Sequence, residues 1–294
     1  MLTILGCNSA VPTTSRFTTS QVLQNGHKSY IIDCGEGAQI RLNEYKIKKT
    51  KIHEIFISHL HGDHFFGLPG IITSMNLAGR ENPLTIYGPI GLKKYLNILK
   101  DIGSFYLNFE LYINELEPSG FNKIFEDKYL EVFSFPLKHR IPTTGFLFKY
   151  DLTYEEIKNL KHGNNITSKD GTLLKYLETT TQEKQAESYA FCSDTIYDEE
   201  LVTYIKGVDL LYHEATYLDD LKDKARERGH ATAKEAALIA KKSEAGKLIL
   251  GHFSSRYKDL SVFIKEAEII FPCVQLAEDG KVFRALEQNK SPKS

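Results

Sequence analysis

Residues 54–64 read EIFISHLHGDH, so a short apolar run ends in the cluster Ser58-His59-Leu60-His61-Gly62-Asp63-His64. Neutral imidazole and carboxylate groups are ligands that suit zinc-like divalent ions. A β-strand followed by a tight turn containing Gly62 can direct the four side chains of this H-x-H-x-D-H pattern toward a common region. One ion rarely needs all four, so the pattern predicts two adjacent metal ions at the end of a strand.

Further candidate ligands follow other apolar runs: His139 follows EVFSFPLK, Asp194 follows SYAFCS and His252 follows KLILG. A lone histidine is more often structural or on the surface, but three such residues after successive strands fit a binuclear site. We assign His59, His61 and His139 to one ion, Asp63, His64 and His252 to the other, and Asp194 to a bridging position. Two Zn²⁺ ions per subunit, with Mn²⁺ as the alternative, can activate a bridging hydroxide, which predicts a hydrolase.

The rest of the chain predicts an α/β protein. Apolar runs typical of strands occur at 2–6, 30–33, 55–58, 84–87, 130–136, 189–191, 210–212 and 248–251. The clearest helix is predicted over 232–242 (TAKEAALIAKK), where Thr232 can act as the N-cap and Glu235 completes a capping box; a second is expected over 260–270. We expect one domain, residues 1–294, with a polar excursion from the core at about 151–187, because no linker divides the chain.

Composition limits the classes of partner. The 294 residues carry 37 Lys and Arg against 38 Asp and Glu, a net charge of -1. Binding to nucleic acid through overall positive charge is therefore excluded, and any such contact must be local. Residues 41–51 (RLNEYKIKKTK) can form a local phosphate-binding patch or simply the solvated face of a helix.

The four cysteines, Cys7, Cys34, Cys192 and Cys273, are scattered and form no C-x-x-C pair. This arrangement fits neither a disulfide framework nor a thiolate zinc site and is expected of a protein in the reducing cytoplasm. The start, MLTILGCNSAVP, has the pattern of a strand rather than of a secretory signal. No stretch approaches the roughly 20 apolar residues of a membrane span, so no membrane association is expected.

The H-x-H-x-D-H cluster with its later His, Asp and His resembles the metallo-β-lactamase fold superfamily. The resemblance implies a four-layer αββα sandwich with the metals at one edge. It also implies that Asp33, in YIIDCGEG, supports the site from behind the ligands. Gly35 and Gly37 would let this loop pass close beneath the metals.

Finer motifs narrow the family. Eight motifs that together cover most of the chain are similar to those of ribonuclease Z. They are LTILGCNSAVPTTSRFTTS, IIDCGEGAQIRL, FISHLHGDHFFGLPG, LKHRIPTTGF, YAFCSDTIY, LLYHEATY, GHATAKEAA and LILGHFSSRY. The most diagnostic are His213-Glu214-Ala215-Thr216 and His230 in GHATA. The resemblance implies a zinc-dependent endoribonuclease that removes the 3′ trailer of precursor transfer RNA, leaves a 3′-hydroxyl on the transfer RNA, and works as a homodimer.

The resemblance also implies roles for three residues. Asp63 would both ligate the second metal and accept a proton from the attacking water, and His230, held by Glu214, would give a proton to the departing 3′ oxygen. From the residues alone, Glu214 could instead hydrogen-bond the strand end while His230 caps the helix near Thr232. We assign no role to His213.

One segment departs from the family pattern. In ribonuclease Z a long arm grips the transfer-RNA elbow, typically with a Gly-Pro element, whereas residues 151–187 contain no proline and carry mixed charge. We therefore expect a shortened arm. A small-molecule phosphodiesterase or arylsulfatase-like hydrolase on the same fold is the alternative enzyme, and a metal-stabilised RNA-binding or structural protein is the non-enzymatic one.

Overall fold

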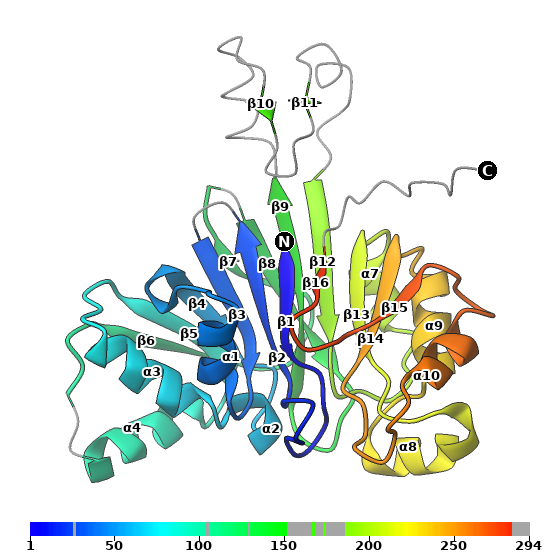
Figure 1. The fold of residues 1–294 in the computed structure, drawn as a ribbon, viewed down its shortest axis with the longest axis horizontal. Coiled ribbons are helices and arrows are strands. Elements are labelled where there is room, and N and C mark those ends of the chain that lie inside the picture. The colour runs from blue at the N-terminus through cyan, green and yellow to red at the C-terminus, as the bar shows by residue number, and fades with distance from the viewer. Residues whose placement is uncertain are drawn as a thin grey trace.

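Two mixed β-sheets pack face to face, and helices cover the outer side of each, which gives the four layers of an αββα sandwich (Figure 1). The computed structural model describes residues 1–25, 28–103, 106–128, 130–151, 166–167, 173–174 and 186–283. The expected fold class is thus confirmed.

The first sheet has the strand order β16-β1-β2-β3-β4-β5-β6. Its strands are β1 (Leu2–Gly6), β2 (Ser20–Asn25), β3 (Lys28–Cys34), β4 (Ile52–Phe56), β5 (Leu84–Pro89), β6 (Leu111–Leu116) and β16 (Val282–Phe283). The second sheet has the order β15-β14-β13-β12-β9-β8-β7. Its strands are β7 (Asn122–Glu126), β8 (Leu130–Leu137), β9 (Thr143–Asp151), β12 (Ala186–Cys192), β13 (Leu210–Glu214), β14 (Lys247–Gly251) and β15 (Val274–Leu276).

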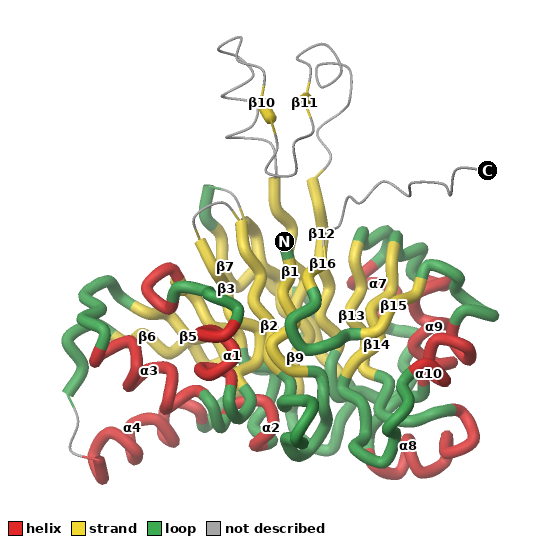
Figure 2. The backbone as a smooth tube through the Cα atoms, in the orientation of Figure 1, coloured by secondary structure: helices red, strands yellow, loops and turns green. Residues whose placement is uncertain are grey.

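Four of the described helices lie on the side of the first sheet: α1 (Ala38–Glu44), α2 (Gly62–Phe65), α3 (Leu68–Leu77) and α4 (Leu92–Gly103) (Figure 2). Four more lie on the side of the second sheet: α7 (Leu201–Ile205), α8 (Lys222–Arg228), α9 (Ala233–Lys242) and α10 (Ser261–Ala267). Two short 3₁₀ helices occupy Lys49–Lys51 and Asp219–Leu221. No helix among the described residues is long and apolar enough to cross a membrane.

The layer between the sheets is rich in aromatic side chains around Phe56 at the end of β4. The Phe56 ring stacks on Tyr87 at 5.1 Å and meets Phe148 of the other sheet edge-on at 5.3 Å. Aromatic pairs of this kind add about 0.5–1.5 kcal/mol beyond their buried area. Because Ser58 and His59 lie only two and three residues after Phe56, this packing fixes where the candidate ligands leave the sheet.

The direction of the strands explains why the candidate ligands meet. Strand β3 is parallel to β4, and β12, β13 and β14 are parallel to one another. β9 pairs antiparallel with both β8 and β12, so β8 runs in the same direction as β12. The carboxyl ends of β3, β4, β8, β12, β13 and β14 therefore lie along one edge of the sandwich, where ligands of layered α/β proteins usually gather.

The expected strands and helices are present, with differences at their ends. β4 ends at Phe56 rather than Ser58, because the Ser58 amide turns away to donate to Asp33 Oδ1 at 2.7 Å. The helix expected over 260–270 is shorter, Ser261–Ala267. α9 begins as expected: Thr232 is the N-cap and forms the capping box with Glu235.

The expected arm, residues 151–187, lies almost entirely outside the described residues. Within it the structure describes β10 (Ile166–Thr167) and β11 (Leu173–Leu174), which pair antiparallel. Its two ends belong to the paired strands β9 and β12, with Asp151 opposite Ala186. The segment thus leaves and re-enters the second sheet at adjacent strands.

Candidate metal centre and proton donor

The first set of candidate ligands comes from the turn after β4 and from the ends of β8 and β12. His61 Nδ1 lies 3.0 Å from His59 Nε2 and 3.2 Å from His139 Nε2. Asp194 Oδ2 completes the set at 3.5 Å from His59 Nε2 and 3.6 Å from His139 Nε2. All four atoms lie within 4.8 Å of one another.

The second set joins α2 to the residue after β14. His64 Nε2 and His252 Nε2 are 3.3 Å apart, and Asp63 Oδ2 lies 3.3 Å from His252 Nε2 and 3.5 Å from His64 Nε2. Asp194 Oδ1 is 3.1 Å from each of these imidazole nitrogens. One carboxylate oxygen of Asp194 therefore faces each set.

The second ring nitrogen of four of these histidines is held in place. Asp33 Oδ2 lies 2.6 Å from His64 Nδ1, and the Gly229 carbonyl accepts from His139 Nδ1 at 2.7 Å. Ser58 Oγ is 3.0 Å from His59 Nδ1, and Thr216 Oγ1 is 2.9 Å from His252 Nδ1. Such contacts orient each imidazole so that its other nitrogen points into the site.

Burial and neighbouring charges set the ionisation of the site. Burial lowers the pKa of His61 and of His139 to about 4, so both are neutral at pH 7 and offer a lone pair. Burial alone would raise the pKa of Asp63, but His64 and His252 hold it well below its usual range. Asp194 behaves likewise, because the surrounding histidines outweigh its burial. Burial alone would lower the pKa of His64, but Asp194, Asp63 and Asp33 raise it well above its usual value. The site thus presents ionised carboxylates together with neutral imidazoles at His61 and His139.

This donor set fits divalent metal ions. Nitrogen and carboxylate oxygen donors converge in the two sets described above, and Asp194, His230 and His252 form a third group that overlaps them. The buried negative charge of Asp63 and Asp194 needs a cation nearby. Asp63 is also anchored: its Oδ2 accepts a hydrogen bond from the Ala10 amide at 2.7 Å. Gly35 passes beneath, and a Cβ there would lie 2.4 Å from the Asp63 carbonyl oxygen, so the close approach requires glycine.

Three residues of this edge adopt the left-handed backbone conformation that side chains disfavour. The φ angles are 53° for Asp33, 49° for Asp194 and 58° for His252. Each costs on the order of 1 kcal/mol, and such strain is typically concentrated where function fixes a side chain. The backbone at the carboxyl ends of β3, β12 and β14 is thus bent in the same way to turn a side chain toward the site.

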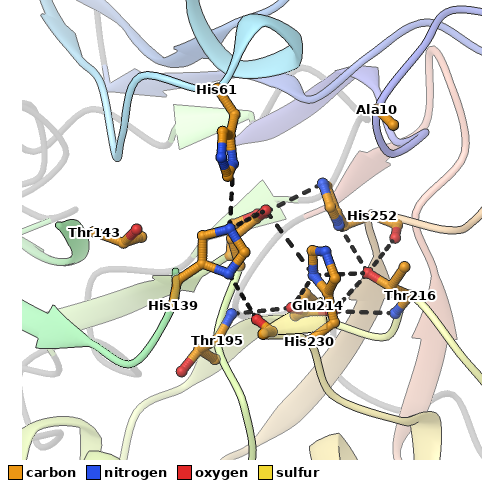
Figure 3. Close-up of polar contacts among 12 residues, drawn as sticks. Ala10, His61, His139, Thr143, Thr195, Glu214, Thr216, His230 and His252 are labelled. Atoms are coloured by element: carbon orange, nitrogen blue, oxygen red, sulfur yellow. Dashed lines mark hydrogen bonds and ion pairs between the residues drawn. The ribbon is translucent and has the colours of Figure 1, made fainter. Parts of the chain in front are cut away.

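Glu214, at the end of β13, is buried and hydrogen-bonded at both oxygens. Its Oε1 accepts from His230 Nδ1 at 2.8 Å and from the Thr195 amide at 2.9 Å, and its Oε2 lies 2.6 Å from Thr216 Oγ1. Burial alone would lower the pKa of His230, but the charge and hydrogen bond of Glu214 raise it to about 9. Figure 3 shows this network, in which dashed lines join Thr216 to His252 and to His230.

His230 lies beside both sets of ligands, with its ring 5.1 Å from that of His139 in the first set and 5.3 Å from that of His252 in the second. The Glu214 bond occupies Nδ1 and leaves Nε2 available to a substrate. A protonated imidazole at pH 7, held by a carboxylate next to a candidate metal centre, can donate a proton to a leaving group.

Comparisons with known proteins agree with this architecture. A family model described as anti-Pycsar protein Apyc1 matches residues 1–272, so the chain belongs to that family. The structure of human tRNase Z, short form, has a TM-score of 0.75 and 29% sequence identity, covering 97% of this chain and 99% of that chain. The metallo-β-lactamase fold protein YhfI from Bacillus subtilis, with a TM-score of 0.72 and 20% identity, shares the fold over 96% of this chain and 98% of its own.

Curated relatives decide the finer assignment. Ribonuclease Z of Cytophaga hutchinsonii is 44% identical, covering 96% of this chain and 95% of that protein. Ribonuclease Z of Parabacteroides distasonis is 39% identical, covering 95% of this chain and 97% of that protein. The chain belongs to the ribonuclease Z family. This family membership confirms the resemblance inferred from the motifs.

In this ribonuclease Z family member, the structure brings all the candidate site residues together at one edge. It also adds residues that the sequence did not single out: Thr216 links Glu214 to His252, and the Ala10 amide holds Asp63. The only sequence signal for Thr216 was its place in the HEAT motif. His213 is buried, with its Nδ1 donating to the Glu214 carbonyl at 2.8 Å, which fits a structural residue.

The basic segment of this ribonuclease Z family member, residues 41–51, is only partly available to a ligand. The Arg41 side chain is 13% exposed and pairs with Glu44 at 2.6 Å and with Asp279 at 3.4 Å. Lys49 donates to Asn43 Oδ1 at 2.8 Å. The remaining lysines, at 46, 48 and 51, make this segment a solvated surface rather than a concentrated patch.

Proposed function

We propose that the protein is a zinc-dependent endoribonuclease of the ribonuclease Z type, which cleaves the 3′ trailer from precursor transfer RNA and leaves a 3′-hydroxyl. The observation that carries this proposal is the Glu214–His230 pair, 2.8 Å apart, beside two clusters of candidate metal ligands. The relatives named ribonuclease Z and the human tRNase Z structure support it. Phosphodiester hydrolysis at such a leaving group needs both an activated water and a proton donor.

We propose two Zn²⁺ ions per subunit, with Mn²⁺ as the alternative. His59, His61 and His139 would hold one ion, Asp63, His64 and His252 the other, and Asp194 would bind both. When bound, the two ions would lower the pKa of the attacking water and stabilise negative charge on the phosphoryl oxygens.

Two proton transfers are needed, and we assign each to a different side chain. Asp63, whose Oδ2 faces His252 Nε2 at 3.3 Å, accepts a proton from the attacking water. On the other side of the scissile phosphate, His230 donates a proton from Nε2 to the departing 3′ oxygen. Glu214 keeps His230 protonated and fixes its ring through Nδ1.

We further propose a homodimer. Supporting it, three large apolar side chains are highly exposed at the ends of α3 and α4: Leu77 (83%), Ile102 (80%) and Tyr106 (85%). The Asn76 side chain donates to the Tyr106 carbonyl at 2.9 Å, which places Tyr106 next to the end of α3. Light scattering checks this directly: the wild-type protein should have the mass of two chains and the L77E/I102E variant that of one.

A cytoplasmic location is part of the same proposal. The four cysteines are all free thiols, a state that a reducing compartment maintains. The transfer-RNA substrate is present there as well.

The proposed activity is tested with purified, zinc-loaded protein and a 3′-extended precursor transfer RNA, compared with a chromogenic bis-aryl phosphate. We expect cleavage of the RNA at one position with a 3′-hydroxyl on the longer product. Hydrolysis of the small ester without any cleavage of the RNA would replace this proposal with a small-molecule phosphodiesterase. Loss of both activities in D63A, with correct folding, is expected from the role of Asp63.

A further inference from the structure

Arg140 directly follows the candidate ligand His139, in the turn between β8 and β9. Its Cγ is 3.2 Å from the position that a Cβ on Gly229 would occupy, and Gly229 precedes His230. The stem of Arg140 therefore packs against the end of α8, while the residue as a whole is exposed. The guanidinium is thus anchored at its base and open to solvent at its tip.

The neighbouring Lys138 provides a contrast. Its ammonium is bound by Asp198 at 3.0 Å and by Glu200 at 2.8 Å, so its charge is already neutralised. Arg140 forms no ion pair or hydrogen bond through its guanidinium with any of the residues that the structure describes. Of the two cationic side chains, Lys138 is therefore already paired, whereas Arg140 is available to bind an anionic ligand.

The charge of Arg140 also acts on the proton donor. Burial is the largest effect that lowers the pKa of His230, and the positive charge of Arg140 adds to it. Two positive groups near each other repel, and the Glu214 carboxylate that pairs with His230 does so through Nδ1 at 2.8 Å. An anionic group of the substrate bound beside His230 would relieve this repulsion.

The position of His230 in the site indicates which phosphate of the RNA would lie near Arg140. In the proposed reaction His230 protonates the departing 3′ oxygen, so the retained part of the RNA extends away on the side of His230. The next phosphate on that part of the strand is the one on the 5′ side of the last retained nucleotide. A guanidinium can bind phosphate oxygens through two parallel N–H groups, which a single ammonium cannot do.

We propose that Arg140 binds the phosphate on the 5′ side of the last retained nucleotide and thereby strengthens the binding of the RNA in the site. This proposal rests on the proposed function. It assigns to Arg140 recognition of the RNA backbone beyond the scissile phosphate, which a small phosphate ester lacks.

The test compares R140A, R140K and the matched control K138A on a 3′-extended RNA, on the same RNA with a neutral methylphosphonate at that one linkage, and on a bis-aryl phosphate. For R140A we expect KM for the RNA to rise about tenfold with little change in kcat, and the slope of log(kcat/KM) against log salt to become shallower by about 0.7. K138A should cost much less, and R140K should recover part of the loss. The loss in R140A should exceed any loss on the bis-aryl phosphate by about tenfold.

The methylphosphonate gives the decisive comparison. The wild-type protein should lose about as much kcat/KM on the modified RNA as R140A loses on the normal RNA, and R140A should lose little more when the linkage is changed. If the losses of kcat/KM caused by R140A and by the methylphosphonate multiplied when the two changes were combined, the assignment of this phosphate to Arg140 would be overturned. Equal effects of R140A and K138A would overturn it too. If the wild-type protein cleaves no RNA, the proposed function fails; if it does and R140A has an unchanged KM, only the role of Arg140 fails.

Discussion

Thr216 Oγ1 lies 2.9 Å from His252 Nδ1, from which it accepts a hydrogen bond, and the same hydroxyl lies 2.6 Å from Glu214 Oε2. A single buried hydroxyl thus connects the carboxylate that holds the candidate proton donor to a candidate ligand of the second metal. The proton-donor pair and the second cluster are therefore parts of one hydrogen-bonded unit rather than two neighbouring ones.

This connection predicts a loss of metal affinity when the hydroxyl is removed. In T216V the side chain keeps its volume, but His252 loses the acceptor that orients its ring and Glu214 loses a donor. Loss of a partner behind a metal ligand typically costs 10- to 100-fold in affinity. Zinc titration against a competing chelator should show a loss of about this size in T216V, whereas T216S, which keeps the hydroxyl, should stay within about threefold of wild type. An unchanged affinity in T216V would mean that the hydroxyl does not support His252.

The Glu214–His230 pair predicts a defect that depends on the leaving group. H230A should lower kcat on precursor transfer RNA by about 100- to 10,000-fold, because the 3′ oxygen then departs without a proton. An aryl oxygen is a far better leaving group, so the bis-aryl phosphate should be much less affected. Elemental analysis should find the metal content of H230A unchanged. Loss of metal in H230A would show instead that this histidine is a ligand.

The two residues should also act as one unit. E214Q leaves the shape of the side chain but removes the charge that keeps His230 protonated, so it should reduce RNA cleavage in the same direction as H230A. Because the carboxylate acts through the imidazole, the double variant E214Q/H230A should be no slower than H230A alone. Rates that multiply in the double variant would indicate that Glu214 has a separate role.

The position of Asp194 predicts how metal content responds to single substitutions. Its two oxygens face different ligand sets, at 3.1 Å from His252 Nε2 and 3.6 Å from His139 Nε2. Elemental analysis under zinc-replete conditions should give two ions for wild type, about one for H61A and fewer than one for D194A. Chelation of the wild-type protein should lower its melting temperature, since ligands that bind only the folded state stabilise it. A single ion in the wild-type protein would contradict the binuclear site.

The sequence predicts best what depends on neighbours along the chain. The capping box of Thr232 and Glu235 is a local pattern, and the structure has it at that position. The H-x-H-x-D-H cluster is equally local, because one turn carries four of its donors. The later candidate ligands could be found because each follows an apolar strand, and strands that run in the same direction bring their carboxyl ends to one edge.

What the sequence leaves out depends on contacts between distant residues. The Ala10 amide reaches Asp63 across 53 positions and Thr216 reaches His252 across 36, and neither pair has a spacing that indicates contact. Strand β2 (SQVLQN) was also not expected, because its polar Ser20 and Gln21 are buried where apolar residues are the rule. Tertiary packing overrides the local pattern at these places.

Glu54 on β4 predicts a pH-dependent stability that is independent of the metals. Burial raises the pKa of this carboxyl from 4.5 to about 7, with Lys28, Asp127 and Arg80 nearby. Its Oε2 is buried without a hydrogen-bond partner among the residues that the structure describes. The folded state therefore holds a proton that the unfolded state releases at lower pH. The stability that this difference contributes is complete below about pH 4.5 and is lost as the pH rises through about 7. The free energy of unfolding falls by on the order of 2 kcal/mol over this range, after allowing for the partial exposure of Glu54.

The variant E54Q has the same shape but cannot ionise, so it should lack this loss. Denaturant unfolding at pH 5 and pH 8 measures the effect as the difference between E54Q and wild type, which cancels the titration of all other groups. We expect that difference to favour E54Q by on the order of 2 kcal/mol more at pH 8 than at pH 5. E81Q, which removes the same charge at an exposed position, should show no such change. A difference that is the same at both pH values would show that Glu54 ionises alike in the folded and unfolded chain.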